Sequence, residues 1–251
     1  MKNDGTVSII SPVHNAAGFI KDSIDSVLAQ TYTDWELILV NDASTDNSAA
    51  IISKYLGDER IKLIIFDENK GAAKARNAGI EAATGRYIAF IDADDVWNSQ
   101  KLQKELEFMK KTGAVFAYTS YEFGDENAVG TGRIVRALPK LSYKEALSRT
   151  IIFTTTVLFD LTGITKEQIM MKSVPSEDTA TWWRILRKGY IAYGLDENLA
   201  VYRRPASSLS SNKFVAIKRI WNLYRNEENL GVVRSMLAFV PWAFRATLRR
   251  L

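Results

Sequence analysis

The chain has 251 residues, 47% hydrophobic and 25% charged, the balance of a globular protein with a sizeable core. With no cysteine and one histidine, His14, it excludes disulfides, thiolate zinc sites and histidine-rich metal centres, so acid–base and metal chemistry falls on 29 Asp and Glu residues. The net charge is +4, yet residues 202–251 alone carry ten Lys/Arg and two acids, a net +8. An acidic body with a basic C-terminal segment predicts an anionic partner for that segment.

The first half of the chain alternates short β-branched runs with helix-period stretches. Strands are predicted at Val7–Ser11, Trp35–Asn41, Ile61–Asp67, Tyr87–Asp92 and Val115–Tyr121. Helices are predicted between them, at Ala17–Ala29, Asp46–Leu56, Gly71–Ala83 and Ser99–Lys111. This alternation indicates βαβ units and a Rossmann-like α/β fold, with a mostly parallel central sheet flanked by helices.

The second half gives weaker signals. Residues 124–136 predict a loop or hairpin, and residues 205–212, rich in serine, predict a mobile loop. Strands are expected at Ile151–Phe159 and Leu199–Arg204, a helix at Ser176–Gly189, and a basic helical extension from Phe214 onward. Within that extension, Pro241 is expected to kink or break the helix.

Targeting signals are not evident in the sequence. The first residues are polar, with no apolar signal segment, and no stretch reaches the roughly 18 apolar residues needed to span a bilayer. The expectation is a cytoplasmic protein.

Polar residues follow the predicted strands at the point where each one ends. They are Pro12 and His14, Asp42, Asp67–Lys70, and Asp92 with Asp94 and Asp95. In open parallel sheets, ligands bind outside the carboxyl ends of the strands, so these residues are expected to share one rim and form a site.

The strongest local signal is Asp92-Ala93-Asp94-Asp95. Carboxylates this close repel one another unless a cation or hydrogen-bond donors relieve them. One reading is a clamp for Mg²⁺ or Mn²⁺ and a diphosphate, because hard cations take carboxylate, phosphate and water oxygens. The other is an acidic turn before a helix.

Three further positions have two readings each. Asp42 can accept a hydrogen bond from a nucleobase or form an Asx turn. The cations Lys70, Lys74 and Arg76 can form an anion site at a helix start or be surface charge. The pair Glu177-Asp178 can hold a general base or be an ordinary acidic helix N-terminus.

Taken in order, these segments resemble the family 2 glycosyltransferases with the GT-A fold. The matching segments are Val7–Asn15, Ser26–Tyr32, Trp35–Asp46, Glu68–Gly71, Ala75–Asn77 and Gly85–Asp95. The specific part of the resemblance covers roughly residues 5–115, and a weaker match, Glu177-Asp178 with Trp182, follows in the second half.

The resemblance implies an inverting, metal-dependent transfer of a hexosyl or N-acetylhexosaminyl group from a nucleoside diphosphate sugar, most commonly UDP-linked. Asp92-Ala93-Asp94 is similar to the family's D-x-D element, with Asp94 on Mn²⁺ or Mg²⁺ and Asp92 toward the ribose. Asp42 matches the carboxylate that reads the base, and Asp178 matches the general base.

Other roles follow from the same resemblance. Pro12, Val13 and Asn15 match the wall of the nucleotide pocket, while Lys70 and Arg76 lie where cations approach the nucleotide. Candidates for acceptor contact or a closing loop are Glu177, Trp182, Arg203 and Arg204. The Arg/Gln-x-x-Arg-Trp motif of processive synthases is not reproduced at Trp182–Ile185, so single sugar additions are expected.

The expected organisation is a donor-binding half at residues 1–115, an acceptor-binding half at 116–213 and an extension at 214–251. The expected acceptor is a glycan or a polyprenyl-diphosphate-linked sugar, in cell-surface polysaccharide synthesis. Residues 231–251 form an amphipathic, Arg-bearing segment suited to an anionic membrane, which would make the protein peripheral on the inner face of the cell membrane. A helix docked on the protein itself and a homodimer contact are the alternatives.

The sequence is also compatible with other functions. An inactive sugar-nucleotide-binding or scaffold protein of the same fold is the main alternative. A nucleotidyltransferase would need a glycine-rich loop where Pro12–Asn15 stands, and a glycosidase would have no use for a nucleotide pocket. Nucleic-acid binding by the basic tail is disfavoured by the apolar face of that tail.

Overall fold

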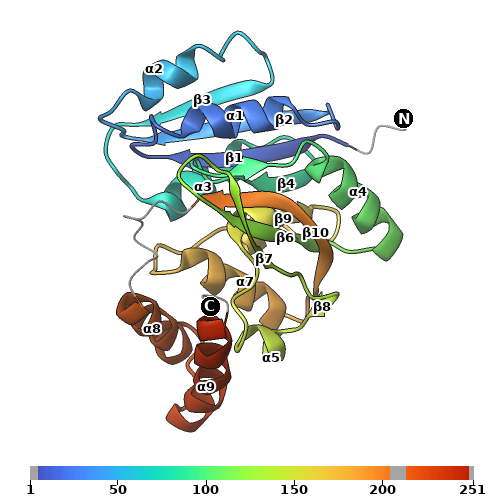
Figure 1. Ribbon diagram of the computed structural model, residues 1–251, viewed down its shortest axis with the longest axis vertical. Coiled ribbons are helices and arrows are strands. Elements are labelled where there is room, and N and C mark those ends of the chain that lie inside the picture. Colours follow the sequence, from blue (N-terminus) through green and yellow to red (C-terminus); the bar gives the residue numbers. More distant parts are fainter. Residues whose placement is uncertain (1–4, 204–212, 249–251) are drawn as a thin grey trace.

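The computed structural model describes residues 5–203 and 213–248, which form a sheet covered on both faces by helices (Figure 1). The strand order is β3-β2-β1-β4-β9-β6-β10-β5, with β7 beside β6 and β8 beside β10. The strands are β1 Val7–Val13, β2 Trp35–Asp42, β3 Ile61–Phe66, β4 Tyr87–Phe90, β5 Val96–Trp97, β6 Phe116–Gly124, β7 Gly130–Val135, β8 Lys140–Leu141, β9 Val157–Asp160 and β10 Ala192–Arg203.

The N-terminal strands β3, β2, β1 and β4 run parallel, as the βαβ pattern predicts. Strand β9 then pairs antiparallel with both β4 and β6, while β6 and β10 are parallel to each other. The sheet is therefore mixed but mostly parallel across its first half. The predicted strand Ile151–Phe159 is only partly right, because a 3₁₀ turn, η1 Thr154–Thr156, precedes β9.

Successive residues of the central strands supply two separate cores. Ile9, Leu37 and Ala89 face one side, where they pack with helices α1 Ile20–Leu28, α2 Ser48–Ser53 and α4 Lys101–Thr112. Their neighbours Ile10, Ile38 and Ile88 face the other side, against α3 Ala72–Ala82 and α7 Glu177–Arg187. Both faces are covered because side chains alternate along a strand, which explains why these strands read as continuous apolar runs.

The predicted halves are parts of one sheet. Residue 115 precedes β6, which lies in the middle of the strand order, so the boundary at 115/116 crosses a continuous structure. The loop or hairpin expected at residues 124–136 is a hairpin, with β7 antiparallel to β6. The second half also contains two short helices, α5 Tyr143–Ala146 and α6 Lys166–Ile169.

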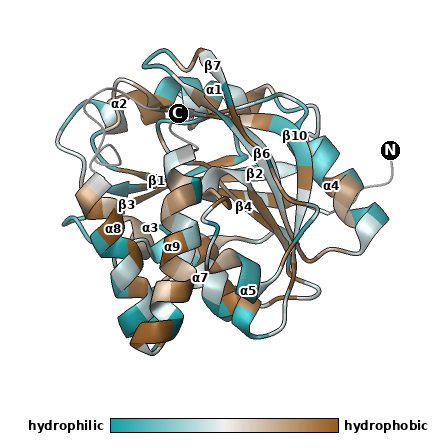
Figure 2. Ribbon diagram, turned by 60° about the horizontal axis from the view of Figure 1, so that its bottom comes forward, coloured by the Kyte–Doolittle hydropathy of each residue, from teal (hydrophilic) through white to brown (hydrophobic). Residues whose placement is uncertain are grey.

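The C-terminal extension consists of α8 Lys213–Asn222, the π-helical turn η3 Leu223–Glu227 and α9 Val232–Leu248. Figure 2 shows α8 and α9 side by side at the end of the molecule that comes forward. The expected break at Pro241 is wrong, since α9 continues through it. None of the helices in residues 5–203 and 213–248 combines the length and apolar character required to cross a bilayer.

Candidate active site

The loop after β4 is held from inside by Asp95. This carboxylate is fully buried and accepts hydrogen bonds from the Thr155 hydroxyl and from the Arg203 amide, the latter at 3.1 Å. The backbone amide of Asp92 donates to the Thr155 hydroxyl at 3.1 Å, and the Ser23 hydroxyl donates to the Asp95 carbonyl at 2.7 Å. Asp95 therefore fixes the loop and leaves Asp92 and Asp94 at its half-buried surface.

The three carboxylates of this loop carry excess negative charge. Burial, reinforced by the neighbouring Asp92, raises the pKa of Asp94 to about 6. Burial and the charges of Asp94 and Asp92 also raise the pKa of Asp95 well above its usual value. Such an arrangement favours a cation, because a cation stabilises the ionised form of each carboxylate.

Asp94 suits a metal that is shared with a substrate. Among the described residues, no three His, Asp or Glu side chains are grouped to enclose an ion without other ligands. Mg²⁺ and similar ions are commonly bound by one or two carboxylates, with phosphate oxygens and water completing the shell. The half-buried Asp94 carboxylate fits that mode, in which phosphate and water, and not further protein side chains, complete the coordination.

Arg76 connects the loop after β4 to the start of α7. Its side chain is buried, with Nη2 2.7 Å from Asp92 Oδ1 and Nη1 2.7 Å from Glu177 Oε1. Burial alone would lower the pKa of Arg76, but the charges of Asp92 and Glu177 outweigh burial and raise it. Arg76 thus orients two carboxylates, and its contact with the nucleotide stays a prediction.

Asp178 lies at the first turn of α7, after Ser176, whose φ of 59° is left-handed. Its Oδ2 accepts a hydrogen bond from the Thr154 hydroxyl at 3.1 Å, and its Oδ1 accepts one from the Thr179 amide at 2.6 Å. Burial, followed by the charge of Glu177, raises the pKa of Asp178. A carboxylate with a raised pKa and a fixed orientation has the properties of a general base.

Two threonines that the sequence reasoning missed link the two acidic clusters. Thr154 binds Asp178, and its neighbour Thr155 binds Asp95 and the Asp92 amide. The 3₁₀ turn η1 therefore sets the position of α7 relative to the loop after β4. The only signal was the run Thr154-Thr155-Thr156, and a run of threonines also fits a β-strand, so it does not indicate a turn.

Asp42 ends β2 and is buried, with 2% of its surface exposed. Its two oxygens accept hydrogen bonds from the amides of Lys70, at 2.6 Å, and Gly71, at 2.8 Å. This pairing fixes the loop before α3, where Lys70 is exposed at the rim. A carboxylate oxygen has more than one lone pair, so contact with a nucleobase stays a prediction for Asp42.

The loops after β1 and β2 are tied together through Asn15. Its side-chain Oδ1 accepts a hydrogen bond from the backbone amide of Thr45 at 2.8 Å, and its backbone amide donates to the Ser44 hydroxyl at 3.1 Å. Asn15 and Ala43 both have φ of 51°, a left-handed conformation that non-glycine residues adopt mainly where the surroundings enforce it. Two strained loops therefore meet at this edge.

Of the predicted pocket wall, Pro12 is half-buried and Asn15 exposed, so both are available at the rim. The side chain of Val13 is fully buried in the core beneath α1, which leaves only its backbone for a ligand. Ala93 is also buried, at 7% exposure, and contributes its backbone to the loop.

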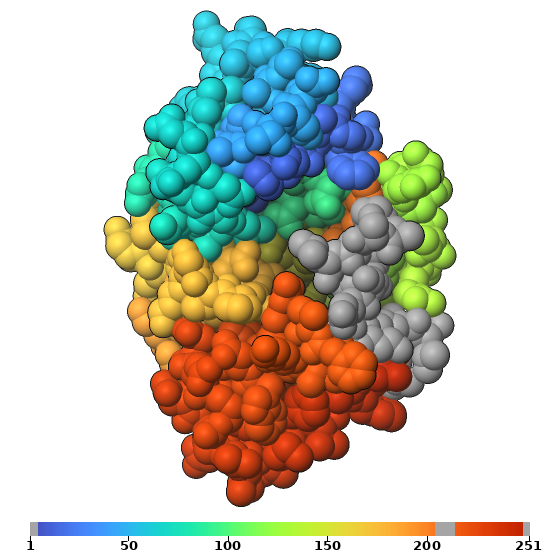
Figure 3. All heavy atoms as spheres, turned by 90° about the vertical axis from the view of Figure 1, so that its left-hand side faces the viewer, coloured from blue at the N-terminus to red at the C-terminus, as the bar shows by residue number. Residues whose placement is uncertain are grey.

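A groove of about 540 Å³, open to solvent, lies beside these loops. It is lined by Lys70, Gly71, Ala72, Ala73, Ser173, Val174, Pro175 and Glu177. Figure 3 shows the molecule hollowed on this face, between the N-terminal half in blue and teal and the C-terminal helices in orange. The groove places the start of α3 opposite the start of α7, next to Asp178.

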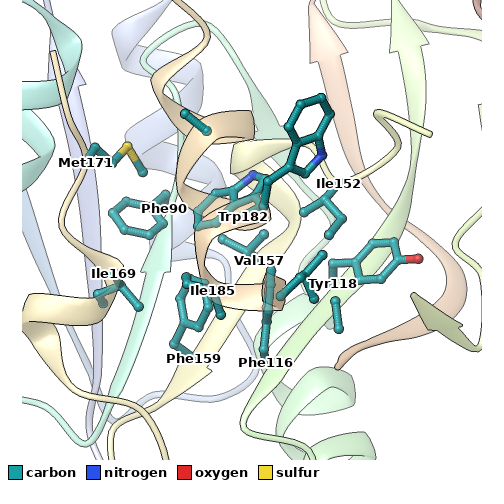
Figure 4. Packing of buried hydrophobic residues seen from close by; sticks show 14 of the residues in the cluster. Phe90, Phe116, Tyr118, Ile152, Val157, Phe159, Ile169, Met171, Trp182 and Ile185 are labelled. Carbon is teal, nitrogen blue, oxygen red and sulfur yellow. The ribbon is translucent and has the colours of Figure 1, made fainter. Parts of the chain in front are cut away.

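Two of the residues predicted to contact the acceptor or to close over the donor have almost no exposed surface. Trp182 is 2% exposed and packs against Phe90, Phe116 and Phe159 in the core, so it has no surface for an acceptor (Figure 4). Arg203 is also 2% exposed, and it is not available to close over a diphosphate.

The guanidinium of Arg203 serves the loop from behind. It donates to the carbonyls of Asp94, at 2.7 Å, and Glu126, at 2.6 Å, and pairs with Asp22 at 2.8 Å. Arg203 thus ties β10 to the acidic loop and to α1. Arg204 and the serine-rich loop at 205–212 lie outside the described residues.

Comparisons with known proteins agree with this architecture. The profile of "Glycosyl transferase family 2" matches residues 8–164. The chain is 42% identical over 249 residues to the putative teichuronic acid biosynthesis glycosyltransferase TuaG of Bacillus subtilis, covering 98% of this chain and 97% of that protein. It is 39% identical over 222 residues to the Escherichia coli UDP-Glc:alpha-D-GlcNAc-diphosphoundecaprenol beta-1,3-glucosyltransferase WfgD, covering 88% and 86%.

Solved structures share the fold at low sequence identity. Staphylococcus aureus TarS 1–349 in complex with UDP-GlcNAc superposes with a TM-score of 0.70 and 17% identity, covering 95% of this chain and 71% of that one. The Pyrobaculum calidifontis mannosyltransferase PcManGT, in complex with GDP-Man and Mn²⁺, gives 0.68 and 19%, covering 90% and 64%. The fold is therefore GT-A, and with the profile match and the 42% identity to TuaG, the chain belongs to glycosyltransferase family 2.

Proposed function

We propose that this glycosyltransferase is inverting, metal-dependent and non-processive, and that it transfers a hexose from a UDP-sugar to a hydroxyl of a lipid-linked acceptor. The observation that carries the proposal is the network joining the loop Asp92–Asp95, which contains Asp94, to the start of α7, which contains Asp178. Arg76 binds Asp92 and Glu177, and the adjacent Thr154 and Thr155 bind Asp178 and Asp95. The loop that carries the candidate metal ligand and the turn that carries the candidate base, 84 positions away, are thus connected by these contacts.

Asp94 is the residue proposed to hold the divalent ion, together with the donor's diphosphate. When bound, the ion would neutralise the negative charge that develops on the departing diphosphate. Asp92, whose oxygen is held by Arg76, is then placed to accept hydrogen bonds from the ribose of the donor. The three carboxylates crowded in this loop repel one another, and a bound cation would relieve that repulsion.

Asp178 is the proposed general base. Its pKa is raised by burial, which makes it a stronger acceptor for the proton of an acceptor hydroxyl than an exposed aspartate would be. The hydroxyl oxygen attacks the anomeric carbon of the donor, its proton passes to Asp178, and the bond to the UDP oxygen breaks. Attack on the face opposite the leaving group inverts the anomeric configuration. The hydrogen bonds from Thr154 and Thr179 hold the carboxylate in place for this step.

The relatives indicate the first substrates to test. WfgD and a second Escherichia coli protein, WfaP, are named as UDP-Glc transferases acting on a diphosphoundecaprenol-linked sugar, and TuaG is named for teichuronic acid synthesis. On that basis we infer UDP-glucose as the donor to test first, a polyprenyl-diphosphate-linked sugar as the acceptor class, and cell-surface polysaccharide as the product. We assign donor binding to residues 1–115 and acceptor binding to 116–213.

The test measures UDP release from UDP-sugars with Mn²⁺ or Mg²⁺ and a lipid-linked acceptor. Asp178→Asn is expected to lower kcat by at least about a hundredfold, the scale of positioned general-base catalysis. Asp94→Asn is expected to abolish the stimulation of UDP release by Mn²⁺ or Mg²⁺. The control Glu59→Gln alters an exposed carboxylate far from the loop and should match the wild type. The linkage formed by the wild type, determined by NMR, should be β from an α-linked UDP-sugar.

Two results would contradict the proposal. Undiminished turnover by Asp178→Asn would remove the assigned base, and a retained anomeric configuration would exclude a single displacement. UDP binding without turnover on any donor and acceptor pair would favour the alternative of an inactive sugar-nucleotide-binding protein.

A further inference from the structure

Helices α8 and α9 present large apolar side chains to solvent. Phe214 is 84% exposed, Val233 72%, Leu237 71% and Phe244 66%. On α9, positions 233, 237, 240 and 244 are spaced three or four residues apart and therefore form one stripe along the helix. We call the exposed residues Phe214, Val215, Ile217, Val232, Val233, Met236, Leu237, Val240 and Phe244 the apolar face.

This exposure exists although α9 is docked on the protein. The opposite side of α9 carries Trp242, which is buried and donates from Nε1 to the Thr150 hydroxyl at 3.0 Å. Phe239 contacts Trp221 of α8 edge-on at 5.8 Å, and Arg245 donates to the Ser148 hydroxyl at 3.0 Å. One side of α9 therefore packs against the protein, while a second apolar side is exposed to solvent.

The helices of the apolar face also carry exposed cations, and the nearby acids are neutralised by ion pairs. Glu227 pairs with Lys172 at 3.0 Å, and Glu228 pairs with Arg187 at 3.0 Å. Within the described part of the chain, Lys218, Arg219 and Arg234 are exposed and form no ion pair. The surface thus combines apolar side chains with unpaired positive charge.

The apolar face lies next to the groove. The ion pair between Lys172 and Glu227 joins the turn between α8 and α9 to the residue that precedes the groove wall at Ser173–Pro175. Figure 3 shows the orange C-terminal helices directly below the hollow, and Figure 2 shows brown apolar residues along both helices. The helices that carry the apolar face are therefore attached to the groove wall through this ion pair.

From these observations we infer that the apolar face is a docking surface for an anionic lipid bilayer. The apolar side chains enter the boundary between headgroups and acyl chains while Lys218, Arg219 and Arg234 bind anionic headgroups, the two signals that hold an amphipathic helix at an interface. A second copy of the chain fits less well, because a two-fold contact places the same patch of each copy opposite itself and brings like cations together. The benefit to catalysis, delivery of a lipid-linked acceptor to the groove, rests on the proposed function.

The test is co-sedimentation of the full chain with vesicles of phosphatidylcholine containing about 30% phosphatidylglycerol, beside vesicles of phosphatidylcholine alone. The double variant Leu237→Glu/Val240→Glu is expected to reduce binding to anionic vesicles at least tenfold. The variant Lys218→Ala/Arg219→Ala/Arg234→Ala should lower it by about fivefold for each cation removed at low salt, and this difference from the wild type should shrink as added salt screens the charges. Val129→Glu places one carboxylate at an equally exposed apolar position on the β6–β7 hairpin and should bind like the wild type.

Vesicle binding is read without any sugar transfer, so it is independent of the proposed function. UDP release with a water-soluble acceptor analogue should stay within twofold for all variants, which also shows that they fold. Binding to anionic vesicles that Leu237→Glu/Val240→Glu leaves unchanged would overturn the inference. So would a lipid-free dimer, measured by sedimentation, that the same variant converts to monomer, because the apolar face would then be a subunit interface.

Discussion

Nη1 of Arg76 lies 2.7 Å from Oε1 of Glu177, and the two residues are 101 positions apart in the chain. The other arm of the same guanidinium binds Asp92, so one buried cation connects the loop after β4 to the start of α7. Its planar fork allows this, since a guanidinium can present separate N–H groups to two carboxylates. The relative position of the acidic loop and α7 depends on this residue.

Replacing Arg76 is expected to damage both stability and turnover. Arg76→Ala leaves Asp92 and Glu177 unpaired in a largely buried place, and the free energy of unfolding should fall by about 3–5 kcal/mol. Urea denaturation measures this loss. Lys21→Ala, which removes an exposed ion pair with Asp25, should change the same quantity by less than about 1 kcal/mol. Equal losses in the two variants would show that the bridge does not hold the site.

The pH dependence of kcat/KM should reflect the raised pKa values of the two acidic clusters. Both Asp94 and Asp178 have to be ionised for the proposed roles, and the pKa of Asp94 is raised to about 6. Activity is therefore expected to fall as the pH drops through about 6, well above the pKa of an ordinary aspartate. The profile is measured at a limiting metal concentration, where most Asp94 carboxylates carry no metal ion. An acid limb near pH 4 under these conditions would contradict the assignment.

The same carboxylate gives a stability prediction for the metal-free protein. Because the pKa of Asp94 is higher in the folded state than in the unfolded state, the folded protein binds more protons between about pH 4 and pH 6, and its stability falls as the pH rises through that window. The Asp94→Asn variant has no titratable group at this position, so its stability should not fall in this way as the pH rises. Above pH 6 it should be more stable than the wild type by up to about 3 kcal/mol, and below pH 4 the two should agree.

Adding Mn²⁺ with UDP should reverse that order, because a ligand that binds only the folded wild type raises its melting temperature. The melting temperature of Asp94→Asn should not respond. A wild type that is insensitive to Mn²⁺ and UDP, or a variant that responds equally, would argue against Asp94 as the metal ligand.

A packing prediction concerns Gly79, where α3 crosses β1. A Cβ at this position would lie 2.4 Å from Cγ2 of Ile10, a fully buried β-branched side chain that has little freedom to move. Gly79→Ala is expected to lower the free energy of unfolding by about 1–3 kcal/mol despite the better helix propensity of alanine. Gly57→Ala, where a Cβ meets nothing within 4 Å, is the matched control and should be close to neutral.

The first half of the fold could be predicted from the sequence because its signals are local. Strands β1 to β4 are apolar runs, helices α1 and α4 have a clear 3.6-residue period and α3 is rich in alanine, so each element is specified by its own residues. The strand ends then place Pro12, Asp42 and Asp92 on one edge by topology alone. Less local features escaped: β9 is short and antiparallel, and the η1 turn before it reads as part of a strand.

Composition and order of residues by themselves determined the α/β class, the acidic loop at Asp92–Asp95 and the family. Only the tertiary structure decided which charged side chains face a ligand and which face the protein. The sequence predicts that Arg76, Arg203 and Trp182 face a ligand, yet all three are buried, because carboxylates and rings distant in sequence surround them. Burial depends on contacts between segments brought together by folding, and no local pattern encodes the partners.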